Sequence, residues 1–336
     1  MTLSQALASN TPFLLSCAGI LGLIVGSFLN VVIHRLPQMM HKAWREQCLD
    51  YLENNHLDNE NPKNEDQNEQ NLDNAKLERS QNDDAGTIDQ SAVSAATTNP
   101  PLGKATEKYN LMVPRSACPA CGHAITAVEN IPVISYLALK GRCAGCKTPI
   151  SSRYPIIEAS TGLLSVIVAW HFGFSLQCAA ALILTWSLIA LSVIDFDHKL
   201  LPDDITLPLL WIGLLLNIGA LFTDSTSSLI GAIAGYLSLW GVYWAFKLLT
   251  RKEGMGYGDF KLLAMLGAWM GWQSLPGIVL LSSFVGAAIG IALILFRGRD
   301  KNIPIPFGPY LAIAGWIYLL WGDQITQVYF NVAGIR

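Results

Sequence analysis

Two aspartates lie at the ends of apolar stretches of this 336-residue chain, where a charged side chain is costly. Asp195 directly follows the apolar run LILTWSLIALSVI, and Asp259 lies in GMGYGDFKLL, just before another apolar run. Ionisable residues at membrane depth are usually functional. Two aspartates held close do not both ionise easily, so the ionised one takes a proton from water while the protonated one polarises a carbonyl. Asp195 and Asp259 are therefore predicted to catalyse aspartyl proteolysis.

The residues around these aspartates leave simpler roles open. Asp259 fits a helix N-cap, while Asp203 and Asp204 precede ITLPLLW and fit an N-cap and a first-turn charge. Gly256 and Gly258 favour more than a cap, because glycine permits positive φ angles or close backbone approach. We expect an extended substrate to pass beside Asp259 at these two glycines.

Four cysteines form a second constellation. Cys118 and Cys121 occur in CPAC, Cys143 and Cys146 occur in CAGC, and residues 122–142 separate the two pairs. Two C-x-x-C turns at this separation let four thiolates converge on one metal ion, typically zinc. The pattern predicts one structural zinc site.

Glycines support this metal site, and a redox role is the alternative. Gly122 and Gly145 fit the tight turns that aim the sulfurs inward. The cytoplasm disfavours disulfides, and a small domain with a thin core gains from a metal. A redox C-x-x-C pair normally occurs singly and with a thioredoxin-like pattern, which the sequence lacks.

The composition predicts the membrane helices that position these residues. The chain is 51% hydrophobic and only 14% charged, against about a quarter charged in soluble domains. The first apolar stretch lacks a basic start and an A-x-A cleavage site, so we interpret it as a retained span. The sequence predicts an all-α polytopic protein with about eight transmembrane helices, at about 12–33, 156–173, 176–194, 205–222, 228–249, 260–273, 275–296 and 306–321.

The basic residues predict the orientation. Every Lys and Arg except Arg336 lies in or beside four loops, while the intervening loops HFGFSLQ and FTDSTSS contain none. This asymmetry places the charged loops and both aspartates on the cytoplasmic side. The formal net charge of −3 gives no indication of a nucleic-acid partner.

The longest loop divides the chain into three expected domains. Residues 1–33 form the first membrane helix, 34–155 form a cytoplasmic domain, and 156–336 form a membrane-embedded peptidase domain. Within the loop, about 52–108 is rich in Asn, Asp, Glu and Gln and has no Phe, Trp or Tyr. We expect this insertion to be disordered and the zinc module to occupy 109–155.

In combination, these motifs resemble the type IV prepilin peptidase family, the bifunctional leader peptidase/N-methyltransferases of pilus assembly and type II secretion. GMGYGDFKLL is similar to the GxGD motif of that family. The insertion is a departure, since the loop is usually shorter in the family. The other similar segments occur in the same order, alongside the Cys pairs: GSFLNVVIHRLP (26–37), ISSRYPIIE (150–158), IDFDHKLLPD (194–203) and IPFGPYLAIAG (305–315).

The resemblance implies a function and its site residues. Asp195 and Asp259 match the catalytic aspartates of the family. The substrates would be prepilins or pseudopilins with a short basic leader, cleaved after glycine at the cytoplasmic face of the bacterial inner membrane. The new amino group would then be methylated with S-adenosylmethionine. The first cytoplasmic loop would carry the methyl transfer, with Gly141 as the best single candidate; alternatively Gly141 only forms a turn before Cys143. Membrane lipid and the pilus or secretion machinery are the further implied partners.

Two other classes of protein explain part of the pattern. A transporter or ion channel would use paired acids to bind cations or relay protons, but such sites lie near the bilayer midplane, whereas Asp195 and Asp259 lie at one edge. A scaffold of the pilus machinery would need neither aspartate for processing. The peptidase interpretation accounts for both constellations.

Overall fold

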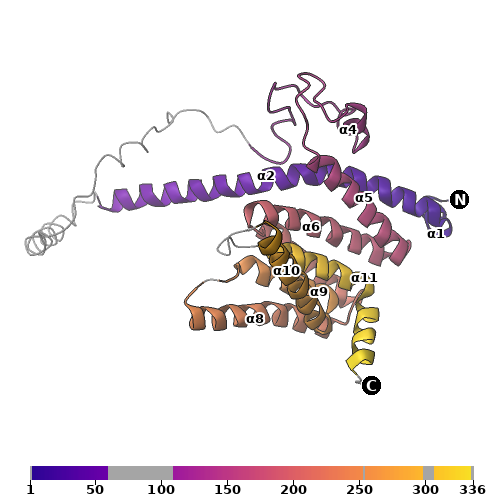
Figure 1. Ribbon diagram of the computed structural model, residues 1–336, viewed down its shortest axis with the longest axis vertical. Coiled ribbons are helices and arrows are strands. Elements are labelled where there is room, and N and C mark those ends of the chain that lie inside the picture. Colours follow the sequence, from indigo (N-terminus) through magenta and orange to yellow (C-terminus); the bar gives the residue numbers. More distant parts are fainter. Residues whose placement is uncertain (1, 60–108, 253, 298–305, 334–336) are drawn as a thin grey trace, which may run out of the picture. The chain divides into compact units, whose positions relative to one another are not determined.

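The computed structural model describes residues 2–59, 109–252, 254–297 and 306–333 (Figure 1). Within these residues the chain is helical almost throughout, and the only extended pairing is two isolated bridges. The expected all-α class is confirmed. The helices are α1 Leu3–Ser9, α2 Thr11–Asn59, α4 Ile134–Ala138, α5 Arg153–Phe172, α6 Leu176–His198, α7 Asp203–Ile218, α8 Ser225–Thr250, α9 Tyr257–Met270, the short 3-10 helix η2 Trp272–Ser274, α10 Leu275–Arg297 and α11 Gly308–Ala333.

Among the residues that the structure describes, five segments are long and apolar enough to cross a membrane. A helix lies at each of the eight expected spans, but α7 has 16 residues and α9 has 14, or about 24 Å and 21 Å at 1.5 Å per residue, against a bilayer core of about 30 Å. The number of eight spans therefore stays a prediction. The five segments are Thr11–Leu52, Arg153–Phe172, Leu176–His198, Ser225–Thr250 and Trp272–Ala292.

The first long helix does not end where the sequence suggested. The expected span ended at residue 33, but α2 continues through Pro37 to Asn59. Residues 52–59 of the expected disordered insertion are thus helical. Residues 60–108 lie outside the described part of the chain.

The chain forms two compact units. One contains Met1–Pro37 and Arg115–Arg336, and the other contains Gln38–Pro114. Both aspartates and all four paired cysteines belong to the first unit. In the second, the Tyr109 hydroxyl donates a hydrogen bond to Gln38. These units group the residues differently from the three expected domains, because the cysteine module lies in the same unit as the membrane helices. The boundaries at 33 and 155 stay predictions.

Small residues allow α2 and α5 to pack closely. A Cβ on Gly22 would lie 2.8 Å from the carbonyl oxygen of Thr161, and one on Gly26 would lie 2.8 Å from the Cα of Glu158. Glycines four residues apart on one helix face let two backbones approach each other, a common mode of packing in membranes. Larger side chains at either position would separate α2 from α5.

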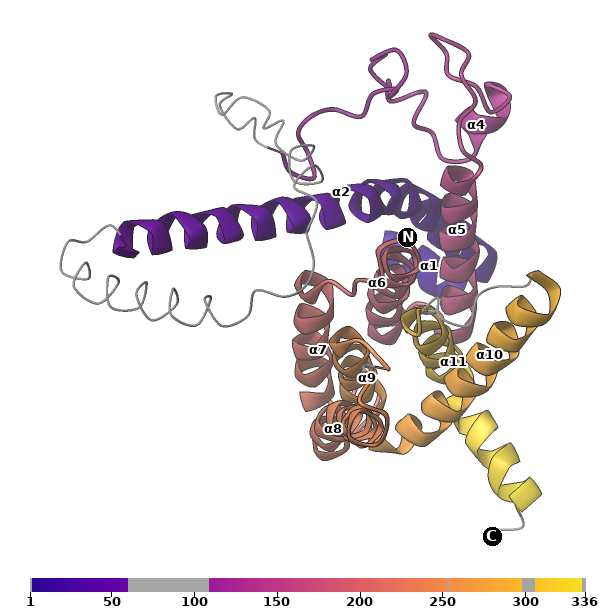
Figure 2. The same ribbon diagram turned by 60° about the vertical axis from the view of Figure 1, so that its left-hand side comes forward.

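Helix α9 is the centre of the first unit. It packs against α7, α8 and α11, and its side chains from Leu262 to Trp269 are buried (Figures 1 and 2). Its last carbonyls also have partners, since the side chain of Asn217 in α7 donates to the carbonyls of Ala268 and Trp269 at 2.9 and 3.0 Å. A buried helix end needs such donors. Protein surrounds most of α9, whose buried residues begin at Asp259, so the carboxylate of its first turn is held at a fixed place.

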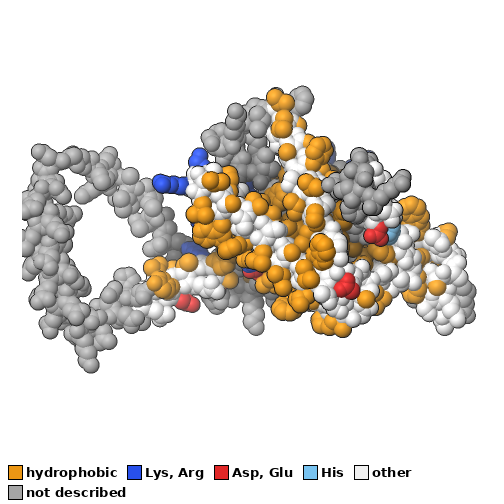
Figure 3. Space-filling view, turned by 90° about the horizontal axis from the view of Figure 1, so that it is seen from below, with side chains coloured by type: hydrophobic (Ala, Val, Ile, Leu, Met, Phe, Trp, Pro, Cys, Tyr) orange, Lys and Arg blue, Asp and Glu red, His pale blue; other side chains and the backbone are white. Residues whose placement is uncertain are grey.

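Apolar side chains cover much of the outside of this unit. Trp170, Trp211, Phe284 and Leu249 are 66%, 63%, 75% and 85% exposed. Figure 3 shows one face on which hydrophobic side chains dominate and charged groups are few. An exposed apolar surface of this extent marks an interaction surface.

Candidate active site and metal centre

Asp195 lies in the last turn of α6, which ends at the left-handed residue Lys199. A carboxylate is unfavourable there, because the carbonyl end of a helix carries partial negative charge. The residue is 6% exposed, and its Oδ2 is buried without a hydrogen-bond partner among the described residues. The carboxylate of Asp195 thus does not stabilise α6. A buried carboxylate oxygen without a hydrogen-bond partner is also unusual.

Asp259 lies in the first turn of α9 and is 7% exposed. The N-cap of α9 is Gly256, and no side chain caps the helix. The interpretation of Asp259 as an N-cap is therefore wrong. A first-turn carboxylate is favourable next to the positive end of a helix, and the burial of this one takes it out of water.

The two aspartates meet although 63 residues separate them in the sequence. They are close enough for the charge of Asp195 to act on Asp259. Leu201, in the connection after α6, lies against a glycine near each aspartate: a Cβ on Gly258 would be 2.8 Å from its Cβ, and a Cβ on Gly308 would be 3.3 Å from its Cδ1. The end of α6, the start of α9 and the start of α11 therefore form one cluster.

The two glycines before Asp259 differ in what they permit. Neither has a positive φ. Gly258 permits the close approach of Leu201, while a Cβ on Gly256 would meet nothing nearer than Oδ2 of Asp259, at 4.0 Å. Gly256 thus keeps space open beside the carboxylate, whereas Gly258 serves packing. A substrate path at both glycines stays a prediction.

Gly308, the first residue of α11, was not among the predicted site residues. A Cβ at Gly308 would lie 2.6 Å from Oδ2 of Asp195, and its backbone amide acts on the same carboxylate. The first amides of a helix have no partner within it and favour anions. The helix start of α11 therefore compensates for the unfavourable end of α6. The motif IPFGPYLAIAG contained this signal, because glycine before proline is typical of a helix start.

Other acidic residues nearby have ion-pair partners. Asp203, in the first turn of α7 as expected, accepts from Lys261 of α9 at 2.6 and 2.8 Å. Its expected role as an N-cap is wrong, because Pro202 occupies that position. Asp197 pairs with Arg153 of α5. These carboxylates hold helix ends together and are at least partly exposed, unlike the two buried aspartates.

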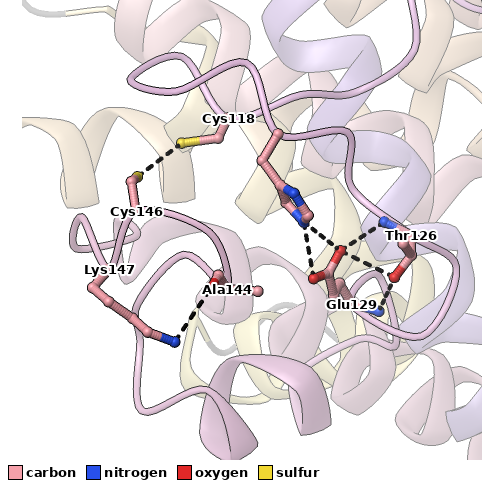
Figure 4. A network of polar contacts seen from close by, with 7 residues as sticks. Cys118, Thr126, Glu129, Ala144, Cys146 and Lys147 are labelled. Carbon is pink, nitrogen blue, oxygen red and sulfur yellow. Dashed lines mark hydrogen bonds and ion pairs between the residues drawn. The ribbon is translucent and has the colours of Figure 1, made fainter.

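The four paired cysteines converge in the structure. Their sulfurs all lie within 4.8 Å of one another, and the sulfurs of Cys118 and Cys146, one from each pair, are 3.8 Å apart (Figure 4). All four are free thiols. Four sulfurs at such distances fit around a single metal ion.

The two cysteine turns have the same backbone pattern. The amide of Cys118 donates to the carbonyl of His123, and the amide of Cys143 donates to the carbonyl of Thr148, both at 2.9 Å. The fourth residue after each first cysteine has a positive φ: Gly122 at 71° and Lys147 at 60°. Gly122 thus lies in a tight turn, as expected. In the second turn Lys147 has this role, and Gly145 instead allows close contact with His123.

Local hydrogen bonds favour the thiolate form at two of the sulfurs. Hydrogen bonds from the hydroxyl and the backbone amide of Thr148 lower the pKa of the Cys146 thiol to about 6. Backbone amides of Ala120 and Cys121 lower the pKa of the Cys118 thiol. Because the thiolate is the metal-binding form, Cys118 and Cys146 suit a metal ion, whereas the pKa of the Cys121 thiol beside the other sulfurs is raised to about 11.

The comparisons with known proteins identify the family. Residues 20–172 match the model of the bacterial peptidase A24 N-terminal domain, and residues 182–291 match the type IV leader peptidase family. The chain belongs to the type IV leader peptidase family. Its N-terminal match contains the cysteine module, and its C-terminal match contains Asp195 and Asp259. No solved structure shows significant similarity to the chain.

Curated relatives of this leader peptidase family match along the whole chain. Proteins named prepilin leader peptidase/N-methyltransferase from Stutzerimonas stutzeri and Pseudomonas aeruginosa are 51% and 50% identical, covering 99% and 100% of both chains. The relative of that name from Aeromonas hydrophila is 52% identical over 98% of both chains. These names support a peptidase and give no support to the ion-transporter alternative.

In this leader peptidase family member, a hydrogen-bonded carboxylate supports the first cysteine turn. Glu129 lies 3.1 Å from Nε2 of His123 and accepts hydrogen bonds from the amide and hydroxyl of Thr126 at 2.8 and 3.0 Å (Figure 4). The backbone amide of Thr126 and the side chain of His123 lower the pKa of Glu129. Glu129 was not among the predicted site residues, since a single acid in a loop belongs to no motif.

Gly141 has a packing role in the structure. Its φ is 67°, and a Cβ there would lie 2.9 Å from the hydroxyl oxygen of Tyr136. Its amide donates to the carbonyl of Tyr136, and its carbonyl accepts from the amide of Ile150, both at 2.8 Å. These contacts explain why glycine occupies the position, and they agree with a turn before Cys143. A role in methyl transfer stays a prediction.

A buried glutamate attaches the cysteine module to the membrane helices. Glu158, in α5, is 9% exposed and accepts a 2.8 Å hydrogen bond from the amide of Val133, the residue that precedes α4. On the neighbouring helix, the Asn30 side chain donates to the Tyr154 carbonyl at 3.3 Å. The loop before α4 is thus held at the junction of α2 and α5.

Proposed function

We propose that the chain is a bifunctional membrane enzyme that cleaves the leader of type IV prepilins and pseudopilins after glycine, then N-methylates the new N-terminus. One observation supports the peptidase most directly. Two buried aspartates from separate helices of a leader peptidase lie within electrostatic reach of each other, and one carboxylate oxygen lacks a partner.

Asp195 and Asp259 act as an acid–base pair. One of them, ionised, takes a proton from water as the water oxygen attacks the scissile carbonyl carbon. The other, protonated, donates a hydrogen bond to the carbonyl oxygen, and the C–N bond breaks as the leaving amine gains a proton. The amide of Gly308 beside Asp195 stabilises negative charge on this pair.

The substrate enters beside Asp259 at Gly256. Leu201 contacts the glycines next to both aspartates, and both carboxylates are at least nine-tenths buried. Substrate binding therefore displaces Leu201, and closure around the substrate excludes bulk water from the pair.

The four cysteines hold one structural zinc ion. In a tetrahedral site with Zn–S bonds of about 2.3 Å, neighbouring sulfurs are about 3.8 Å apart, which is the distance between Cys118 and Cys146. Cys121 and Cys143 complete the set. Thiolate ligands without an oxygen donor favour zinc over magnesium or calcium.

The cysteine module carries the methyl transfer. S-adenosylmethionine, when bound, supplies a methyl group that passes from its sulfonium sulfur to the new α-amino nitrogen, which loses a proton. Gly141 and its neighbour Tyr136 form the turn that we assign to this activity. The attachment of the loop through Glu158 keeps the module next to the membrane helices, so a cleaved substrate has a short path to it.

The enzyme lies in the bacterial inner membrane with both sites facing the cytoplasm. The apolar surface of the helices supports a lipid environment, and the distribution of Lys and Arg supports the orientation. The pilus or type II secretion machinery is its proposed partner, because it consumes the processed subunits.

Mass spectrometry of a full-length prepilin tests the proposal. The purified, detergent-solubilised protein with S-adenosylmethionine should remove the leader and add one methyl group; without S-adenosylmethionine it should only remove the leader. An intact substrate, with folded protein and retained zinc, would contradict the peptidase. Cleavage without methylation would leave the peptidase in place and overturn the second activity.

A further inference from the structure

Four large apolar side chains form an exposed tip on the cysteine module. They recur every third residue, and the last two lie on one face of the short helix α4. Each is between 41% and 72% exposed. The apolar tip consists of Val128, Ile131, Ile134 and Leu137. Exposed apolar side chains that gather in one short stretch mark an interaction surface.

The apolar tip is attached to the sides of two membrane helices and not to their ends. The amide of Val133 donates to Glu158, five residues after the start of α5. The side chain of Asn130 lies 3.5 Å from the hydroxyl of Ser27, six residues before the expected end of the first span at residue 33. At 1.5 Å per residue, these contacts lie about 8 and 9 Å along the helices, on the membrane side of those ends. In both views α4 lies next to the start of α5 (Figures 1 and 2).

The backbone of this segment is suited to a place with little water. Lipid offers no hydrogen-bond partners, so amides at membrane depth need acceptors within the protein. The amides of Ser135, Leu137 and Leu139 donate to the carbonyls four residues earlier, at 2.9 to 3.1 Å. The amide of Val133 instead uses the carboxylate of Glu158. An acid is costly in a membrane helix, and this contact gives Glu158 a reason to be there.

Cations follow the apolar tip, with no acid among them. Residues 130–157 contain four basic residues and no Asp or Glu. Two of the four, Lys140 and Arg142, are exposed and lie within five residues of Leu137. Apolar side chains beside cations are typical of elements that lie in the membrane interface, and anionic lipids attract such cations. A second copy of the chain fits this surface less well, because like charges would face each other.

We infer that the apolar tip inserts into the bilayer interface, where its side chains contact acyl chains and Lys140 and Arg142 contact anionic lipid headgroups. Interfacial elements bury their apolar face about 5–10 Å into the boundary between headgroups and acyl chains, which agrees with the depth of the contacts at Ser27 and Glu158. The inference needs a membrane protein and does not depend on the proposed function. The cysteine module then lies on the membrane and is not surrounded by cytoplasm.

Photo-crosslinking in lipid nanodiscs tests the inference. The photoreactive amino acid benzoylphenylalanine replaces Leu137 in the full-length protein, which is placed in nanodiscs of phosphatidylcholine and phosphatidylglycerol. Ile125 is the control position, because it is 42% exposed in the same module but lies outside the apolar tip. After illumination, mass spectrometry of the labelled peptide should find lipid adducts at position 137 and few or none at position 125.

Substitution of the cations tests the headgroup contact. Lys140→Gln or Arg142→Gln should lower the ratio of phosphatidylglycerol to phosphatidylcholine adducts at position 137 by about 5-fold, the contribution of one cation at an anionic surface. Lys147→Gln is the control, because the ammonium of Lys147 donates to the carbonyl of Ala144 at 3.2 Å within the second cysteine turn. It should leave the ratio unchanged. An unchanged ratio in all three variants would remove the headgroup contact.

The other outcomes of the crosslinking are distinct. Lipid adducts at neither position, or equally at both, would overturn the insertion. A crosslinked dimer as the main product would make the apolar tip an interface between two copies. An added prepilin as the main adduct would make it a substrate surface, and the lipid inference would fail in either case. If the labelled protein melts early, the same label at Ile134 decides, since Ile134 lies on the same face of α4.

Discussion

The aspartate pair and the cysteine module obtain their geometry by different means. Around the aspartates, α9 is buried from Leu262 to Trp269 and its neighbours pack on it directly. Among residues 115–152, only Cys143 is buried. A stretch this short cannot form a sufficient core and usually needs a metal or disulfides. Helix packing therefore sets the first site, whereas the second is a cluster of four cysteines that could hold a metal ion.

This difference teaches what each site depends on. The aspartates are held by side chains that pack without regard to metal, so their site should survive loss of zinc. The cysteine module has two short turns, a hydrogen bond between His123 and Glu129, and its attachment through Glu158. It should depend on zinc for its own order and much less on the aspartates. Substitutions that impair the aspartate pair or the cysteine module, but not both, test this difference.

The largest effect is expected for Asp259→Asn or Asp195→Asn. Either change removes one member of the acid–base pair and should lower the rate of prepilin cleavage by about 10²- to 10⁴-fold or more. Methylation of a peptide that already has its mature N-terminus should persist, as should zinc content. Asp204→Asn, an exposed first-turn acid of α7, is the control. A variant that still cleaves at the normal rate would exclude that aspartate from the pair.

Cys143→Ser should remove the metal and spare the peptidase. Zinc should fall from about one to well below one per chain, because three thiolates bind much more weakly than four. Methylation should be lost with it, while cleavage should fall by less than about 10-fold because α9 does not rely on the module. Cys178→Ser, a cysteine outside the cluster, is the control. Elemental analysis measures zinc, and the cleavage and methylation assays measure the two activities. An equal loss of both activities would show that the peptidase depends on the cysteine module.

Gly308→Ala should impair cleavage with little change in folding. The added Cβ would lie 2.6 Å from Oδ2 of Asp195, and a displacement of about 1 Å at a catalytic group costs about 10²-fold in rate. Gly241→Ala, in α8, adds the same methyl group where nothing lies within 4 Å. We expect the thermal midpoints of the two variants to agree within a few degrees and the kcat values to differ. Equal kcat values would remove Gly308 from the site.

The smallest effect is expected for Glu129→Gln. The change removes the charge that faces His123 but keeps most of the shape and one acceptor oxygen. Because the pair is partly exposed, the expected loss is small, and zinc release to a chelator should accelerate by about 2- to 5-fold. Cleavage should not change. Chelator kinetics with a coloured zinc indicator measure the rate, and a complete loss of zinc would show that Glu129 matters as much as a ligand.

Several features of the fold were predictable from local patterns. The apolar runs located every long helix, and the CPAC and CAGC turns predicted a metal cluster, because both signals depend on residues near one another in sequence. The end of α2 was not predictable. The segment from residue 34 to 59 is polar, so it was expected to be a loop. A polar segment can still be helical when it contains residues that favour helices, and here α2 continues to Asn59.

The neighbours of the aspartates needed the tertiary structure. Leu201 and Gly308 are ordinary residues of a connection and a helix start, and neither has a spacing that relates it to Asp195 or Asp259. Glu129 and Glu158 were missed for the same reason, since their partners are backbone amides and a histidine that sequence patterns do not pair.

The sequence by itself determined which groups carry the chemistry: two aspartates at the ends of apolar runs, four cysteines in two turns, and the helices between them. The apolar runs predict which segments are buried, and the spacing of the paired cysteines predicts the geometry of their turns. Only the tertiary structure decided that the end of α6, the start of α9 and the start of α11 meet at one place. Contacts between distant segments depend on how helix surfaces fit together, and the close packing of glycines and large side chains that sets this fit has no local signature.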